Sequence, residues 1–229
     1  MSLKTKTKRN NKKGKKVQSI DYLSILTKLG LYLIALALLL LLIIFYPVVV
    51  KEIEYRILKP NKNISVLAPT DGFNGFIDPK KEIVAVDKEF SIVVPKIGAN
   101  SKVVSDVDPY NSQIYQRALT RGVAHAKGTV YPGQVGNSFY FAHSSDNFYN
   151  ANRYNSVFYL LNKLEEGDLL YFVYKGETFK YKVLQVKIVS AESIDYLKGT
   201  TEKKLATLMT CWPAGTTIQR LVVVGELVE

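Results

Sequence analysis

Three residues that could together perform acyl transfer each stand at the end of an apolar, strand-like run. Cys211 ends the run 205–210, His143 ends the run 139–142, and Arg220 opens a further run of Leu and Val. A thiol becomes a strong nucleophile when a neighbouring base or cation raises its thiolate fraction, and a guanidinium can stabilise a developing negative charge. If these strand ends meet at one rim of a β-structure, the sequence predicts a cysteine-dependent acyl-transfer site there.

Cys211 is the only cysteine in the chain, so it cannot form an internal disulfide. Reactivity is then the natural explanation for the thiol, with an inert buried cysteine as the alternative. His125 is the only other histidine and could in principle be the base. We favour His143, because a strand end fixes an imidazole more firmly than the turn-like stretch 125–128. Two histidines and one cysteine, without a carboxylate pair at ligand spacing, argue against a structural zinc, so no metal site and no cofactor are expected.

The first fifty residues divide into a basic segment and an apolar segment. Residues 1–28 contain nine Lys or Arg and one acid, Asp21, and so carry +8 of the net charge of +11. Residues 29–50 contain no charge and are rich in Leu and Ile. At about 1.5 Å per residue, this stretch would span a hydrocarbon core of roughly 30 Å. We predict a basic, disordered cytoplasmic tail followed by a transmembrane helix that contacts lipid from Leu29 to Val50.

A cleavable signal peptide is the alternative to a membrane anchor. Its apolar region should be about 7 to 15 residues long and be followed by small residues. Here the apolar run is longer and ends in Pro47 and three valines. A basic segment stays inside by the positive-inside rule, so the chain after Lys51 is expected outside the cell, in a single-pass protein of the cell membrane. The residues after 28 carry only +3, which argues against nucleic-acid binding.

After the predicted span, the composition indicates a linker and then a β-rich domain. Residues 51–89 mix charges with several prolines and glycines, and we expect a stalk there. From residue 90 to 229, short β-rich runs separated by Gly, Pro, Asn and Asp are typical of a barrel or sandwich. Two stretches, 111–120 and 156–165, have the apolar spacing of helices. The candidate strands are 90–94, 102–105, 139–142, 168–174, 178–189, 205–210 and 219–228.

This domain contains the run TLMTC at 207–211, a segment that ends at His143, and Arg220 followed by apolar residues. These motifs resemble those of sortases, the membrane-anchored cysteine transpeptidases of bacterial cell surfaces. The run 207–211, TLMTC, matches the family's TLxTC signature, and the segment ending at 141–143 is similar to the family's histidine segment. Arg220 with the apolar residues after it resembles the family's arginine strand. The resemblance covers roughly residue 90 to the C-terminus, with the three catalytic types in family order. It implies a mostly β fold, a closed sortase-type barrel of about eight strands with two or so short helices.

The resemblance also implies a reaction. Cys211 would attack a peptide carbonyl in an LPxTG-type sorting signal, Arg220 would stabilise the oxyanion, and His143 would protonate the leaving amine. An amine acceptor at the cell surface, or water, would then resolve the thioester. The expected partners are proteins with LPxTG-like sorting signals and that acceptor amine. Thr210 matches the threonine before the family's cysteine and is a candidate substrate-binding residue, unless it merely fills the strand.

Some features leave alternatives open. Trp212-Pro213 after the cysteine resembles the Cys-x-Pro of class D and class E sortases, and the Asn-rich segment 144–155 either borders the substrate groove or is a solvated loop. Another extracytoplasmic thiol peptidase or transpeptidase is one alternative function, although an L,D-transpeptidase would have an arginine two residues after the cysteine. A non-catalytic, membrane-tethered β-barrel that binds a partner is the other. An unreactive Cys211 would favour it.

Overall fold

The computed structural model describes residues 22–57, 64–69, 82–144, 157–193, 195 and 201–228. Most of the predicted basic tail, parts of the predicted stalk and nearly all of the Asn-rich segment 144–155 lie outside these residues. The chain divides into two compact units, Met1–Phe45 and Tyr46–Glu229.

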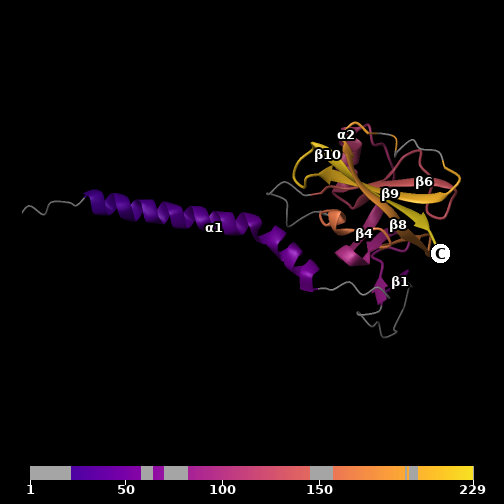
Figure 1. Ribbon diagram of the computed structural model, residues 1–229, viewed down its shortest axis with the longest axis horizontal. Coiled ribbons are helices and arrows are strands. Elements are labelled where there is room, and N and C mark those ends of the chain that lie inside the picture. Colours follow the sequence, from indigo (N-terminus) through magenta and orange to yellow (C-terminus); the bar gives the residue numbers. More distant parts are fainter. Residues whose placement is uncertain are drawn as a thin grey trace, which may run out of the picture. The chain divides into compact units, whose positions relative to one another are not determined.

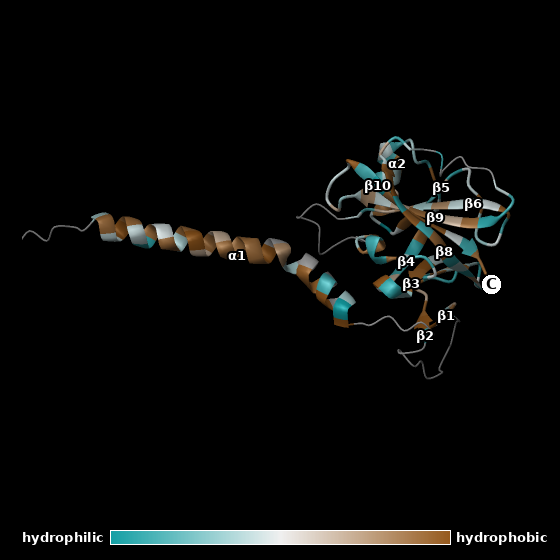
Figure 2. Ribbon diagram, in the orientation of Figure 1, coloured by the Kyte–Doolittle hydropathy of each residue, from teal (hydrophilic) through white to brown (hydrophobic). Residues whose placement is uncertain are grey.

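The N-terminal helix α1 runs from Tyr22 to Ile57. Its stretch Tyr22–Ile43 is long and apolar enough to cross a membrane, and Figure 2 shows these turns mostly brown and the last turns of α1 partly teal. The helix is longer at both ends than the predicted span 29–50. Lys28, just before the predicted span, is a good helix former, and no glycine follows Val50 within the helix. The helix therefore continues past both predicted boundaries.

Eight strands form a closed barrel in the order β10-β8-β7-β3-β4-β5-β6-β9, as Figure 1 shows in part. This confirms the predicted mostly β fold and its closed barrel. The strands of the barrel are β3 (Phe90–Val94), β4 (Ala99–Val107), β5 (Val123–Ala126), β6 (Gly136–Phe141), β7 (Leu169–Tyr174), β8 (Glu177–Ser190), β9 (Lys204–Trp212) and β10 (Gln219–Leu227).

Alternate side chains along these strands point inward and fill the barrel. In β9, Ala206 and Leu208 belong to the main buried cluster, and in β10 Leu221 and Val223 do. Successive side chains of a strand point to opposite faces, so the residues between them line the outer face. Cys211 has the parity of the outer face of β9, and Arg220 has that of β10.

Two short strands lie within the segment that was expected to be a stalk. β1 (Ser65–Leu67) and β2 (Glu82–Val84) pair in parallel. Val66 of β1 belongs to a second buried cluster with Val93 and Val173 of the barrel. Part of this segment therefore packs on the barrel through apolar contacts.

One of the two predicted helices is confirmed. α2 (Ser112–Leu119) begins after Asn111, whose side chain accepts a hydrogen bond from the Ile114 N–H, a typical N-cap. It connects β4 to β5, which pair in parallel and so require a crossover.

The helix predicted for 156–165 is wrong. Residues 157–160 form turns, and only a 3-10 helix, η2 (Leu161–Lys163), follows them. Phe158, Leu161 and Leu164 are buried in the main cluster. These side chains, three residues apart, pack against the barrel. Periodicity alone cannot distinguish such a short apolar pattern from that of an α-helix. A second 3-10 helix, η1, covers Pro95–Ile97.

Candidate active site

Cys211 and Arg220 are direct neighbours across two strands. β9 and β10 are antiparallel, and their register pairs Arg220 with Cys211. Directly opposite residues of an antiparallel pair have side chains on the same face, with Cβ atoms about 4.5–5.5 Å apart. Both residues are half-buried. The structure thus brings together the predicted nucleophile and the predicted cation.

His143 follows the strand on the other side of β9. β6 and β9 are parallel, and the last pair of their register is Phe141 with Met209. The contact continues one residue further, because the Ala142 N–H donates to the Met209 carbonyl at 3.2 Å. Extending this register by one more residue sets His143 beside Cys211. β6 ends at Phe141, so His143 does not close the strand as expected, but comes just after its last hydrogen bond.

Thr210 ties these two strand ends together. Its hydroxyl donates to the Ala142 carbonyl at 2.9 Å, and its side chain is 3% exposed. This bond fixes the main chain immediately before His143 to the residue immediately before Cys211.

The guanidinium of Arg220 is held by the turn that precedes β10. Its Nη1 donates to the carbonyls of Thr217 and Gln219, each at 3.0 Å. Both bonds use the same nitrogen, so Nη2 and Nε have no hydrogen-bond partner among the residues that the structure describes. A hydrogen bond from Ser190 lowers the pKa of Glu192, and the positive charge of Arg220 contributes to that lowering. An anchored guanidinium with unused donors is suited to binding an oxyanion.

His125 lies on the opposite side of the sheet from the thiol. Of the stretch 125–128, which was expected to be turn-like, only residues 127 and 128 form a turn, whereas His125 belongs to the strand β5 and pairs with Tyr140 of β6. Tyr140 pairs with Leu208, which points into the barrel, whereas Cys211 has the other parity. His125 is fully buried, and its Nε2 donates to the Val130 carbonyl at 3.0 Å. Its ring therefore belongs to the barrel interior.

Burial lowers the pKa of His125, and its hydrogen bond to Val130 offsets this only in part. The folded barrel therefore holds this ring neutral, while the unfolded chain takes up a proton as the pH falls below the ordinary value of 6.5. We expect the free energy of unfolding to have its full value above pH 6.5. As the pH falls below 6.5, it should decrease by at most about 1.4 kcal/mol per pH unit for one such group. Chemical unfolding of the protein in detergent at pH 7.5 and 5.5 measures this loss.

The matched variant for this measurement is His125→Gln, which cannot take up a proton. We expect it to lose less stability than the wild type between these two pH values. An equal loss in both proteins would mean that His125 is not the group responsible.

Sequence reasoning missed the contacts that hold the site together. The carbonyls of Thr217 and Gln219 carry no residue-specific signal, and the Thr210–Ala142 bond depends on strand pairing. Within the described part of the chain, no three His, Cys, Asp or Glu side chains come close enough to hold a metal.

Comparison with protein-family models decides the family. A model described as the sortase domain matches residues 92–228, which is more than half of the chain. The chain belongs to the sortase family. Members of this family are cysteine transpeptidases, and the described part of this sortase contains one free cysteine, Cys211.

Solved structures agree with this assignment. This sortase is similar to sortase C-1 from Actinomyces oris, with 32% identity over 63% of this chain and 76% of that chain, and a TM-score of 0.52. Sortase A from Corynebacterium diphtheriae is 28% identical over 62% of this chain and 60% of that one, also with a TM-score of 0.52. A search among curated proteins finds no match.

A third similar structure is sortase C from Clostridium perfringens, determined with the C-terminal cell wall sorting motif. It is 31% identical over 61% of this chain and 69% of that chain, with a TM-score of 0.50.

Proposed function

We propose that this sortase cleaves an LPxTG-type sorting signal through a thioester on Cys211 and transfers the protein to an amine at the cell surface. The observation that supports this proposal best is the direct pairing of Cys211 with Arg220, beside the strand end that carries His143. A nucleophile, an oxyanion donor and a proton donor are the three groups that acyl transfer requires.

In the proposed reaction, the Cys211 thiolate attacks the scissile carbonyl, and a C–S bond forms as the carbonyl oxygen becomes an oxyanion. The unused donors of Arg220 bind that oxyanion. His143 protonates the leaving amine as the C–N bond breaks, which leaves a thioester. The acceptor amine then attacks the thioester carbonyl and gives a proton to His143, the C–S bond breaks, and the Cys211 thiolate is regenerated. Attack by water instead would make the enzyme an endopeptidase and hydrolase.

The substrate class is carried over from a relative. The sortase C of Clostridium perfringens was determined with a C-terminal cell wall sorting motif, and a related signal is the natural donor here. The residues after Cys211 favour a class D- or class E-like member, because Trp212 is followed by Pro213. Substrate contact by Thr210 stays a prediction. Its buried, bonded hydroxyl favours a role in aligning the two strand ends.

The location proposed for this enzyme follows from its first fifty residues. We infer a basic cytoplasmic tail over 1–28, a single lipid-embedded anchor over 29–50, a connecting segment over 51–89 and an extracellular catalytic domain over 90–229. The charge of the tail supports this orientation by the positive-inside rule.

The test uses the full chain in detergent, incubated with a library of LPxTG-type peptides, with and without a glycine-based amine, and read by mass spectrometry. We expect an adduct on Cys211 whose mass equals the peptide without its leaving group, and a peptide–amine product when the amine is added. If no peptide gives an adduct while iodoacetamide still alkylates Cys211, the enzyme acts on another substrate. If the thiol of the folded protein is also inert, the catalytic proposal is wrong.

A further inference from the structure

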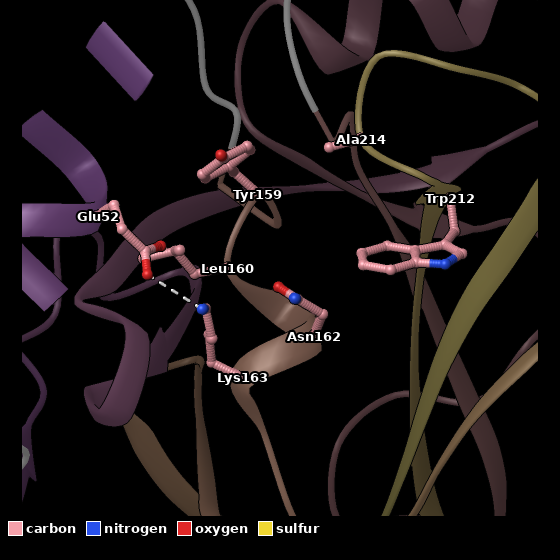
Figure 3. A pocket seen from close by; sticks show the side chains of 7 residues that line it. All are labelled: Glu52, Tyr159, Leu160, Asn162, Lys163, Trp212 and Ala214. Atoms are coloured by element: carbon pink, nitrogen blue, oxygen red, sulfur yellow. Dashed lines mark hydrogen bonds and ion pairs between the residues drawn. The ribbon is translucent and has the colours of Figure 1, made fainter. Parts of the chain in front are cut away.

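A cavity of about 170 Å³ lies beside Trp212, the residue that follows Cys211. Its walls are Glu52 from the end of α1, four residues from the segment around η2, and Trp212 and Ala214 from the end of β9 and the turn after it. Figure 3 shows Trp212 on one side, Glu52 and Lys163 on the other, and Asn162 between them. The cavity is smaller than the roughly 300–1,000 Å³ of sites for drug-sized ligands, so it suits one or two small residues.

The cavity is separate from the face on which the thiol lies. Trp212 pairs with Gln219 at the last position of the β9–β10 register, one residue beyond the pair of Cys211 and Arg220. Successive strand residues point to opposite faces, so the indole and the thiol leave β9 on different sides. The two faces meet at this strand end. A molecule in the cavity could therefore remain in place while an acyl chain occupies Cys211.

The charged groups of the cavity neutralise each other. The Lys163 ammonium donates to the Glu52 carboxylate at 3.1 Å, and this bond lowers the pKa of Glu52 and keeps it ionised. Arg56, which does not line the cavity, lies 3.5 Å from the same carboxylate. Because the two lining charges are paired with each other, neither is free to bind a phosphate or a polyamine.

The remaining groups fit an uncharged peptide chain. The side-chain amide of Asn162 has no hydrogen-bond partner among the described residues, and an amide both donates and accepts. It can therefore bond the C=O and N–H of a peptide unit. Tyr159, Leu160, Ala214 and the indole of Trp212 provide flat or aliphatic surface around it.

We propose that this cavity is the subsite for the peptide chain of the acceptor amine, bound between the amide of Asn162 and the indole of Trp212. This inference rests on the proposed transpeptidase function. It makes the chain that follows the membrane span part of the acceptor site, because Glu52 forms one of its walls. A catalytic domain that begins after α1 would lack that wall.

Trp212 is the only tryptophan of the chain, so its fluorescence reports occupancy directly and without catalysis. We expect acetyl-triglycine amide, an uncharged peptide, to cause a saturable change in the fluorescence of the full chain in detergent. Asn162→Phe, which fills the cavity from an exposed position, should weaken this binding by about tenfold or more. Asn162→Gln keeps the amide, and Glu166→Gln changes an exposed residue outside the cavity; both should bind within about threefold of the wild type.

A second measurement follows the decay of the thioester with triglycine or with hydroxylamine, which is too small to need the subsite. Asn162→Phe should raise the KM for triglycine by about tenfold and leave acylation and the hydroxylamine rate unchanged. An unchanged KM, or the absence of saturable peptide binding, would overturn the subsite. Saturable binding that depends on Asn162, without any thioester on Cys211, would leave the cavity as a peptide-binding site, overturn its assignment to the acceptor and count against the proposed cleavage of an LPxTG-type signal.

Discussion

Replacing Cys211 with alanine is expected to abolish formation of the acyl-enzyme and to lower the rate of peptide cleavage by about 10⁴-fold or more. The chain contains no other cysteine, so no second thiol can take over the reaction. The substitution removes one sulfur from a half-buried position, and the strand pairing around it uses main-chain groups. Intact-protein mass spectrometry after rapid mixing with the sorting peptide measures the adduct.

Cys211→Ser provides the matched control for this result. It retains a nucleophilic atom at the same place, but a hydroxyl is far less ionised than a thiol, so we expect nearly the same loss of activity. Thermal unfolding of both variants should match the wild type within a few degrees. Cleavage by Cys211→Ala at more than about a hundredth of the wild-type rate would show that this thiol is not the nucleophile.

Arg220→Ala should lower the rate of acylation by about 10²–10³-fold, because loss of an oxyanion donor costs that much in other acyl-transfer enzymes. The effect should fall on the chemical step, since the oxyanion exists only near the transition state. Single-turnover acylation at saturating peptide isolates this step. We expect the concentration of peptide that gives half the maximal rate to change by less than about threefold.

Two further variants separate charge from geometry at this position. Arg220→Lys keeps the positive charge but loses the planar guanidinium, which bonds the Thr217 and Gln219 carbonyls and still has free donors. This variant should therefore recover only part of the acylation rate that Arg220→Ala loses. Arg117→Ala removes an exposed arginine of α2 and should change nothing. If Arg220→Ala lowered only peptide affinity and left the acylation rate intact, Arg220 would be a binding residue.

The strands that carry the candidate site were predictable because each has a clear apolar run. β9 is slightly longer than the predicted strand 205–210, and β10 lies within the predicted strand 219–228. The closed barrel was expected from the resemblance to the family. The strand β5 was missed, because it has only four residues, stands between Gly122 and the turn at Lys127 and Gly128, and is too short to show an alternation. Its burial of His125 depends on pairing with Tyr140, which no local pattern reveals.

The cavity beside Trp212 could not be predicted from the sequence. Its walls come from residue 52, residues 159–163 and residues 212–214, and only the folded chain brings these together. The apolar spacing of 156–165 indicated a helix, in which the side chains of Asn162 and Lys163 would point in other directions. The one signal available was the position of Trp212 directly after the cysteine.

The closure of the barrel limits how an extended peptide can be recognised. Many proteins that bind extended peptides add them as a further strand to an exposed sheet edge, where main-chain hydrogen bonds supply affinity without regard to side chains. Each barrel strand here already has a partner on both sides, so along these paired stretches no such edge exists. Under the proposed function, a sorting signal that contacts these paired stretches would lie across the outer face and be read by side chains and turns. Such reading by side chains would make the topology itself a source of sequence selectivity, and the same closure protects the paired stretches from edge-to-edge aggregation.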